Sequence, residues 1–233
     1  MRAEYIDHMG TDLTVVNAAR VSFDKQSDPV ADDWYCSTCE GYGCVECDDI
    51  SDKDKGLINY LAKHKHFTPF THPQITLRYT VPIFVARQEF KHIVGFTRNE
   101  VSRRYVDDTP EFYMPETWRS RPEGSVKQGS GKDEVKETCN GHDVGQAYFE
   151  FVEDAKDFYN QLLDSGIAPE QARMILPQSM YTSYYVTGSL AAFARFVKQR
   201  TDPHAQVEIQ ELAKMVDKVI KPLFPVSWEA LVN

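Results

Sequence analysis

The segment that decides the fold runs through residues 75–105 and reads Ile75-Thr-Leu-Arg-Tyr-Thr-Val-Pro-Ile-Phe-Val-Ala-Arg-Gln-Glu-Phe-Lys-His-Ile-Val-Gly-Phe-Thr-Arg-Asn-Glu-Val-Ser-Arg-Arg-Tyr105. Apolar residues alternate with mostly polar ones over residues 75–85, and this period of two predicts a long strand. Pro82 marks an edge, a bulge or the end of that strand. A short helix at residues 86–94 is expected next, with Gly95 ending or bending it.

The second half of the segment is a basic island in an acidic protein. The chain has a net charge of −9, yet residues 87–104 contain five Lys or Arg against two Glu. Arginine pairs with phosphate through a planar fork, and Ser and backbone N–H groups complete such anion cradles. A solvated charged face is the alternative. Interleaved apolar residues argue against it, and the preceding strand would hold the segment on a rigid scaffold. We therefore predict one local anion site.

The bulk composition is that of a globular protein. The chain has 233 residues, of which 42% are apolar, with 12 Tyr and 13 Phe, so it can build one sizeable core or two small ones. No apolar run approaches a membrane span, and the polar N-terminus does not resemble a signal peptide, so a cytoplasmic protein is expected. The negative net charge argues against broad nucleic-acid binding.

Helical spacing, capping residues and turn residues predict the remaining elements. These are a strand and a helix in residues 1–23 with the helix at 12–20, a helix at 52–64, short strands at 101–106 and 112–114, and C-terminal helices at about 148–162, at 169–177, from Thr187 or Ser189, and after Asp202-Pro203. Residues 116–145 are polar and predict a long mobile loop. The expected fold is a single α+β domain in which a small antiparallel sheet packs with a helical bundle.

A cysteine cluster interrupts this pattern between residues 30 and 50. It reads Cys36-x-x-Cys39-x-Gly-x-Gly-Cys44-x-x-Cys47 and contains two ligand pairs at zinc spacing. The glycines permit the tight turns that a tetrahedron of four sulfurs requires. The first half resembles the Cys-x-x-Cys-x-Gly-x-Gly unit of chaperone zinc domains. The preferred interpretation is an inserted structural zinc knuckle, and reduced free thiols or a redox pair are the alternatives.

Six ordered blocks of the sequence resemble one known family. They are Ala18-Ala-Arg-Val-Ser-Phe23, His64-Lys-His-Phe-Thr-Pro-Phe-Thr-His72, Pro82-Ile-Phe-Val-Ala-Arg-Gln88, the run from Arg87 to Tyr105, Gln171-Ala-Arg-Met-Ile-Leu-Pro177 and Arg200-Thr-Asp-Pro-His-Ala-Gln206. Together they look like the flavin-dependent thymidylate synthases, whose signature is Arg-His-Arg followed at a set spacing by Ser. Here Lys91-His-Ile93 replaces the Arg-His-Arg, and the spacing to Ser102 is one residue longer.

The resemblance implies an enzyme, a methyltransferase that makes dTMP from dUMP. It implies FAD as the redox carrier, methylenetetrahydrofolate as the one-carbon donor and NADPH as the reductant. In this family the flavin carries the redox and one-carbon chemistry, and no protein side chain attacks the uracil ring. The resemblance also implies a homotetramer whose sites are shared between subunits.

Site residues follow from the resemblance position by position. The dUMP site would comprise Gln88, Glu89, Phe90, Lys91, Glu100, Val101, Ser102, Arg103, Arg104, Arg173 and Arg200. The FAD site would comprise Thr68, Lys91, His92, Ile93, Glu100, Ser189, Ala191 and Arg195. Arg200 is the expected catalytic residue, because a fixed cation at the uracil edge stabilises the enolate-like charge that makes C5 nucleophilic. His66 would lie near the flavin and folate face.

Two other functions compete with this one. A zinc knuckle beside a basic run is also typical of a nucleic-acid-binding module, although the net charge and the absence of a second basic stretch argue against it. A family member that has lost catalysis is the other alternative. It is suggested by Lys91, which lacks the guanidinium fork, and by Ile93, which lacks both fork and charge.

Overall fold

The computed structural model describes residues 1–30, 35–36, 41–42, 50–122 and 129–233. Within the predicted insertion it contains two short paired strands, β2 (Tyr35–Cys36) and β3 (Gly41–Tyr42). The zinc prediction for Cys39, Cys44 and Cys47 lies outside the described residues, and Cys36 is described only as part of β2. None of the helices within these ranges is long and apolar enough to cross a membrane.

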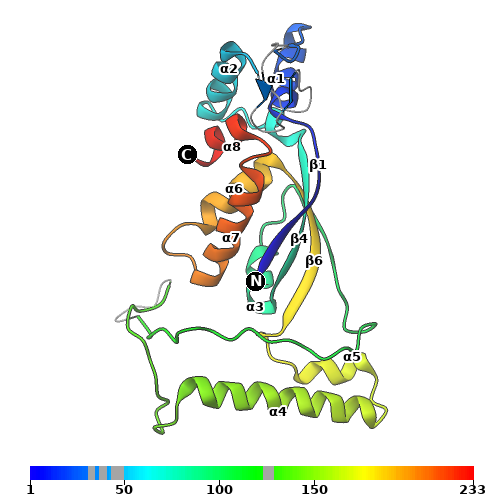
Figure 1. Ribbon diagram of the computed structural model, residues 1–233, viewed down its shortest axis with the longest axis vertical. Helices are drawn as coiled ribbons and strands as arrows, with labels where there is room; N and C mark the ends of the chain where they lie inside the picture. Colours follow the sequence, from blue (N-terminus) through cyan, green and yellow to red (C-terminus); the bar gives the residue numbers. More distant parts are fainter. Residues whose placement is uncertain (31–34, 37–40, 43–49, 123–128) are drawn as a thin grey trace.

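A twisted antiparallel sheet of four strands is the centre of the molecule (Figure 1). Its strands, in spatial order, are β1 (Arg2–Met9), β4 (Gln74–Pro82), β6 (Tyr181–Ser189) and β5 (Phe96–Glu100). In β4, side chains that face the helices are fully buried, and they alternate with partly exposed residues on the other face. The buried set is Ile75, Leu77, Tyr79 and Val81. The predicted small antiparallel sheet is therefore confirmed.

Helices cover one face of this sheet (Figure 1). The helices on this side are α3 (Ile83–Glu89), α6 (Leu190–Arg200), α7 (Val207–Ile220) and α8 (Pro225–Val232). At one end of the molecule lie α1 (Asp12–Arg20) and α2 (Asp52–Lys63), joined by the insertion. The 3-10 turns are η1 (Val21–Phe23), η2 (Thr68–Thr71) and η3 (Arg173–Ile175). Phe193, Phe196, Leu212 and Trp228 are fully or almost fully buried and form the core with the sheet.

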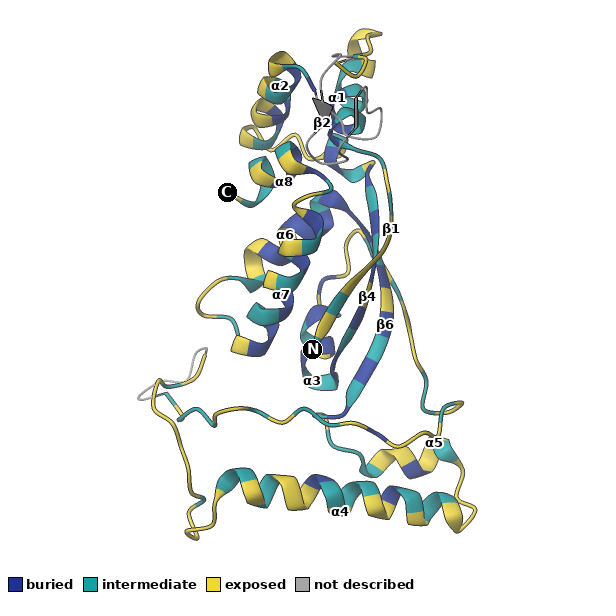
Figure 2. Cartoon of the chain, in the orientation of Figure 1, coloured by how far each residue is buried: buried dark blue, intermediate teal, exposed yellow. Residues whose placement is uncertain are grey.

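Helix α4 (Val144–Asp164) lies apart from this core together with α5 (Pro169–Ala172), beyond the end of the sheet (Figure 1). Val152 and Tyr159 are buried, but most of the helix is intermediate or exposed (Figure 2). Three large aromatic side chains are about half exposed, namely Phe149 at 47%, Phe151 at 56% and Phe158 at 49%. An apolar helix face of this kind has little to pack against within its own chain.

Several expected elements are wrong in place or kind. Strand β6 occupies the middle of the sheet and was not predicted. The short helix begins at Ile83 rather than residue 86, because Pro82 has the extended geometry of an N-cap. The strand expected at 101–106 lies instead at Phe96–Glu100, since the chain turns where the Tyr105 N–H bonds back to Ser102.

Other boundaries also shift. The strand expected at 112–114 is reduced to one isolated bridge between Phe112 and Met180. The polar loop ends at Asp143, whose side chain accepts from the Gln146 N–H and starts α4. The last long helix begins at Val207, and α8 follows it without having been predicted.

Both ends of the Cys-rich insertion are tied to one carboxylate, that of Asp54. The Ser27 hydroxyl donates to its Oδ1 at 3.1 Å, and the Ser51 hydroxyl donates to its Oδ2 at 2.8 Å. Arg20 donates Nε to the same carboxylate at 3.1 Å, and Asn17 exchanges two hydrogen bonds with the Ser27 backbone. Burial alone would raise the pKa of Asp54, but the bonds from Arg20 and the serines outweigh it and lower the pKa. We call these residues the Asp54 junction.

Candidate active site

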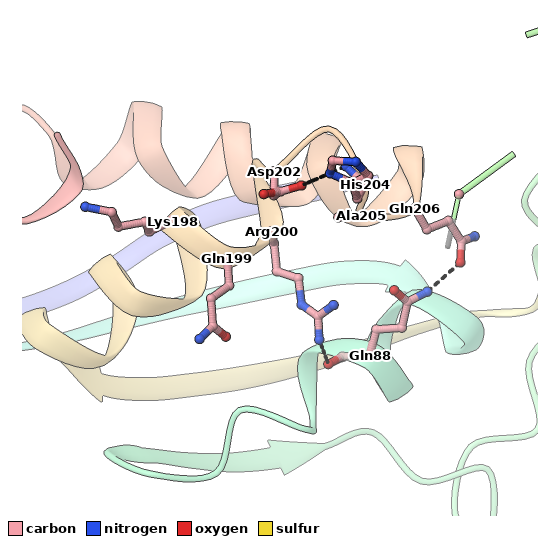
Figure 3. Close-up of a pocket in the computed structure, with 9 residues that line it drawn as sticks. Gln88, Lys198, Gln199, Arg200, Asp202, His204, Ala205 and Gln206 are labelled. Atoms are coloured by element: carbon pink, nitrogen blue, oxygen red, sulfur yellow. Dashed lines mark hydrogen bonds and ion pairs between the residues drawn. The ribbon is translucent and has the colours of Figure 1, made fainter. Parts of the chain in front are cut away.

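A cavity of about 540 Å³ opens where α6 ends, beside α3 (Figure 3). Ligand pockets commonly have a volume of this order. The described residues that line it come from α3, from the end of α6, from the turn before α7 and from the long polar loop. They are Gln88, Gly129, Lys198, Gln199, Arg200, Asp202, His204, Ala205 and Gln206.

Arg200 is fixed at the wall of this cavity by two acceptors. Its Nε donates to Nε2 of His92 at 2.9 Å, and its Nη2 donates to the backbone oxygen of Gln88 at 3.4 Å (Figure 3 shows the second bond). Within the described part of the chain, no carboxylate forms an ion pair with Arg200. Its charge is therefore held in place by neutral groups and remains available to an anionic ligand.

His92 acts as the acceptor for Arg200 because its ring is neutral. A guanidinium can only donate, so Nε2 of His92 carries no proton and Nδ1 does. The side chain is 7% exposed and packs edge-on against Phe196, with ring centroids 5.1 Å apart. Burial, followed by the charges of Arg200, Arg195 and Arg98, lowers the pKa of His92 to about 4. The sequence predicted a flavin contact at this position, whereas the structure gives its Nε2 to Arg200.

Gln88 is held by a second set of polar residues. Its side-chain Nε2 donates to Oε1 of Gln206 at 2.6 Å, and Gln206 in turn donates Nε2 to Oε2 of Glu208 at 2.8 Å. Arg119, from the long polar loop, donates to the other oxygen of Glu208 at 2.7 Å. Glu208 is only 4% exposed. This chain of contacts links the loop to the cavity.

Glu89 and Arg98 brace the segment between α3 and β5. The Glu89 side chain is 1% exposed and accepts from Arg98 at 2.6 and 2.8 Å and from the Tyr184 hydroxyl at 3.1 Å. Burial raises the pKa of Glu89, although Arg98 and Tyr184 oppose the shift. Arg98 also donates to the backbone oxygen of His92 at 2.6 Å. The carboxylate predicted to contact dUMP is thus turned into the core, where Phe90 packs edge-on against Tyr184.

The other predicted dUMP contacts lie outside this cavity. Arg103 pairs with Asp108 at 2.9 Å, Arg104 lies over the Tyr105 ring, and Glu100 accepts from Thr182 at 2.6 Å. The remaining positions are Lys91, exposed in the turn after α3, Val101 and Ser102, just after β5, and Arg173, which follows α5. Figure 1 shows α5 well separated from α6, so one chain does not bring Arg173 to Arg200. Of the predicted dUMP set, the structure gathers only Gln88 and Arg200 around the cavity.

Most of the predicted flavin contacts lie along the first half of α6 and the segment before β5, whereas Glu100 ends β5 and Thr68 begins η2. Ser189 caps α6, its hydroxyl accepting from the Ala192 N–H at 3.3 Å, and Ala191 is in the first turn. Arg195 donates to the backbone oxygen of Val94 at 2.5 Å. This bond places the Arg195 guanidinium beside Ile93 and Val94, which are each 72% exposed. Thr68 and His66 are exposed near η2.

The residues around Ile93 and Arg195 suit a dinucleotide such as FAD, which has both an apolar ring system and a charged pyrophosphate. Ile93 and Val94 form an exposed apolar edge, which suits a ring system, and Lys91 and Arg195 supply cations, which suit a pyrophosphate. No group of three or more metal-binding side chains occurs among the described residues.

Comparison with known proteins shows the family to which this chain belongs. The family model described as thymidylate synthase complementing protein matches residues 4–226. A flavin-dependent thymidylate synthase from Thermosipho melanesiensis is 36% identical over 228 residues, which cover 98% of this chain and 89% of the relative. The chain belongs to the flavin-dependent thymidylate synthase family. Another member, from Thermus thermophilus, is 33% identical over 226 residues, covering 97% of this chain and 73% of that one.

Solved structures extend the similarity to the fold. The UMP/dUMP methylase PolB from Streptomyces cacaoi, bound with 5-bromo-dUMP, is 32% identical with a TM-score of 0.74, covering 98% of this chain and 93% of that one. The same protein bound with 5-bromo-UMP has a TM-score of 0.76 at 32% identity and covers 98% of this chain and 92% of that one. The predicted α+β fold of a flavin-dependent thymidylate synthase is confirmed.

Within this flavin-dependent thymidylate synthase, the sequence prediction missed Gln206 and Glu208. Both lie at the start of an amphipathic helix, and a Glu in the first helical turn is common on electrostatic grounds alone. A burial signal was present, however. Glu208 lies four residues before Leu212 of the apolar stripe of α7, so the two side chains share the buried face of the helix.

Proposed function

We propose that this chain catalyses the reductive methylation of dUMP to dTMP with the cavity at Gln88 and Arg200 as its pyrimidine site. The observation that carries the proposal is the geometry of Arg200, which neutral His92 and a backbone oxygen hold at the cavity wall. Membership of the flavin-dependent thymidylate synthases and the match to a methylase bound with 5-bromo-dUMP support the choice of substrate.

The chemistry of the chain's own residues follows from that geometry. A cation at the edge of the uracil ring stabilises negative charge on the imide, and this charge makes C5 nucleophilic. Arg200 suits that task because no carboxylate among the described residues forms an ion pair with it, although Asp202 lines the same cavity. His92 keeps the guanidinium oriented without competing for the ligand.

FAD supplies the redox chemistry and carries the one-carbon unit when bound. The residues that would hold it are Lys91, Ile93 and Arg195, which are exposed beside one another or carry a cation. We propose methylenetetrahydrofolate as the one-carbon donor and NADPH as the reductant. The exposed His66, whose ring lies 6.2 Å from that of Tyr60, would contribute to the folate face.

We propose that the active assembly is a homotetramer in which a second copy completes each site. Two observations support it. Ser102, Arg103, Arg104 and Arg173 carry anion-binding groups that lie away from the Arg200 cavity in one chain. Helix α4 also presents half-exposed aromatic side chains beyond the sheet, as a surface for a second copy of this chain would.

For the Cys-rich insertion we propose a structural zinc site formed by Cys36, Cys39, Cys44 and Cys47. The sequence spacing supports it, and the Asp54 junction closes the base of the segment that would fold around the ion. Metal analysis of protein purified without chelator should give about one zinc per chain. A value near zero would contradict the proposal.

The decisive experiment measures tritium release from C5-labelled dUMP by FAD-loaded protein with methylenetetrahydrofolate and NADPH. We expect release that depends on all added components and that is lost in Arg200→Ala. A protein that binds FAD yet releases no tritium would point to an inactive family member. A protein that cannot be loaded with FAD, or that binds an oligonucleotide rather than dUMP, would overturn the proposal.

UMP is a second candidate substrate. The reason is specific, since the structurally similar PolB is described as a methylase of both UMP and dUMP and was solved with 5-bromo-UMP. The same assay with C5-labelled UMP, run in competition with dUMP, separates the two. Preferential release from UMP would reassign the substrate.

A further inference from the structure

A directional chain of hydrogen bonds runs from Glu208 through Gln206 to Gln88. Glu208 lies in the first turn of α7, where the positive end of the helix favours its charge. Burial alone would raise its pKa, but bonds from Arg119 and then Gln206 outweigh burial and lower the pKa of Glu208. The side chain is therefore a carboxylate, which can accept hydrogen bonds but cannot donate them.

An acceptor at one end fixes the orientation of every amide that follows. Because Glu208 can only accept, Gln206 must present its nitrogen, and it does so at 2.8 Å. The Gln206 oxygen is then left to accept, and it takes Nε2 of Gln88 at 2.6 Å. Gln88 must consequently turn its own oxygen away from Gln206. Figure 3 shows this oxygen on the side toward Arg200.

We propose that Glu208 and Gln206 are positioning residues that present the side-chain oxygen of Gln88 to the ligand as a hydrogen-bond acceptor. The inference rests on the proposed function and deepens it. Without the carboxylate, the two amides could flip together and present a nitrogen instead. The group recognised must be a donor, and in a pyrimidine nucleotide such as dUMP the donors are the ring imide N–H and the sugar hydroxyl, not the phosphate.

The first test is Glu208→Gln, assayed at pH 8 for dUMP affinity and turnover. The new amide can both donate and accept, so the direction of the chain is no longer imposed. We expect the Kd and KM for dUMP to rise about tenfold, the equivalent of about one oriented hydrogen bond, with a much smaller change in kcat. Equal dUMP affinity in E208Q and the wild type would overturn the proposal.

A swap of the two residues provides the rescue. In Q206E/E208Q the carboxylate stands at position 206, where it can accept from both the new amide at 208 and Nε2 of Gln88. The direction at Gln88 is restored, so dUMP affinity should return to within about twofold of the wild type. A double variant that binds no better than E208Q would show that Glu208 has only a structural role.

Two further variants separate direction from folding. Arg119→Gln removes the ion pair with Glu208 but leaves the bond to Gln206, so it should lower the thermal midpoint and, at pH 8, keep dUMP affinity within about twofold. Because Arg119 is the main group that opposes the effect of burial on the pKa of Glu208, the affinity of R119Q should fall toward that of E208Q as the pH is lowered. Gln206→Met breaks the chain at its middle and keeps the ion pair, so it should weaken dUMP binding even if E208Q fails to fold. Loss of affinity in R119Q but not in Q206M would overturn the proposal.

Ligand analogues identify the donor that Gln88 serves. N3-methyl-dUMP lacks the imide N–H, and 2′,3′-dideoxy-UMP lacks the sugar hydroxyl. If an analogue lacks the donor that Gln88 recognises, the wild type and E208Q should bind it with equal affinity. The wild type should bind the other analogue about tenfold more tightly than E208Q does. If both analogues retain this difference, the oxygen of Gln88 meets neither donor and the inference fails. Wild-type protein that does not bind dUMP at all would overturn the proposed function itself.

Discussion

At the scale of single residues, the environment of His92 decides its role. A histidine in a segment rich in charged residues is expected to be exposed to solvent. Here the imidazole is buried against Arg200 and Phe196, and Arg195 and Arg98 lie nearby. The lone pair of its Nε2 accepts the hydrogen bond from Arg200. Two residues 108 apart in the sequence thus form one unit. No local pattern reports a contact of that kind, although the resemblance did single out Arg200.

The lowered pKa of His92 makes stability depend on pH. Between its ordinary value of 6.5 and its folded value of about 4, the unfolded chain binds a proton here that the folded chain does not. The contribution of His92 to stability is therefore present above pH 6.5 and is lost as the pH falls toward 4. Urea midpoints measured from pH 7 to pH 4 should fall more steeply for the wild type than for His92→Gln.

The same substitution distinguishes positioning from folding. Gln at this position can still accept from Arg200, whereas Ala cannot, so H92Q should retain more activity than His92→Ala. We expect kcat/KM to fall about tenfold or more in H92A. Equal activity in the two variants would argue that the Arg200–His92 bond does not position the guanidinium.

At the scale of elements, β4 could be predicted and β6 could not. The large apolar residues of β4 alternate plainly. In β6 the buried positions include Thr182 and Gly188, so the alternation of burial is hidden behind small and polar side chains. The bounds of α1 and the start of α2 are confirmed, and of the two expected starts of α6 the structure has Ser189, because capping residues and helical spacing are local signals.

The ring of Phe96 packs directly against Gly188 and leaves no room for a side chain at this position. A Cβ at this position would come within 2.4 Å of Cδ1 of Phe96, which belongs to the neighbouring strand β5. Gly188→Ala should lower the free energy of unfolding by about 1–3 kcal/mol, as expected for overpacking. Chemical denaturation measures the loss. Gly56→Ala is the control, since a Cβ there meets nothing within 4 Å and should be harmless or stabilising.

The Asp54 junction gives a second prediction at this scale. Asp54→Asn replaces the charged acceptor that Arg20 pairs with by a neutral amide, so it should destabilise the protein by about 2 kcal/mol, as expected for loss of a charge-assisted hydrogen bond. Because the pKa of Asp54 is lowered in the fold, its contribution is present above the ordinary value of 3.8 and is lost as the pH falls below it. Asp52→Asn is the matched control, since Asp52 is fully exposed. Thermal midpoints of the two variants should differ, and equal midpoints would contradict the prediction.

At the scale of the whole molecule, the residues of the predicted site are divided between places. Gln88 and Arg200 line the cavity, whereas Arg173 lies with α4 and α5 at the far end. A sequence pattern names the residues expected in a site, but it does not show where the fold places each of them. Nor does a sequence pattern identify the hydrogen-bond partner of the Gln88 side chain. Gln206 is 118 residues from Gln88, and His92 is similarly far, 108 residues, from Arg200.

The exposed aromatic side chains of α4 make the proposed assembly testable. Phe151 and Phe158 are seven residues apart and share one side of the helix. Replacing both with Glu should shift the protein to smaller species in light scattering and raise the KM for dUMP. Asp154→Asn, an exposed change on the same helix, should leave the mass unchanged. A double variant with the mass of the wild type would exclude α4 from the interface.

The Asp54 junction has a consequence for how this enzyme could be altered. Ser27 and Ser51, which flank the Cys-rich insertion, both bond to the Asp54 carboxylate. The segment between them can therefore change in length while these two hydrogen bonds are kept. The junction joins α1 and α2, at the end of the molecule opposite α4 (Figure 1). It is therefore a natural attachment point, where a reporter peptide or a capture tag could replace the cysteine segment with both ends already anchored.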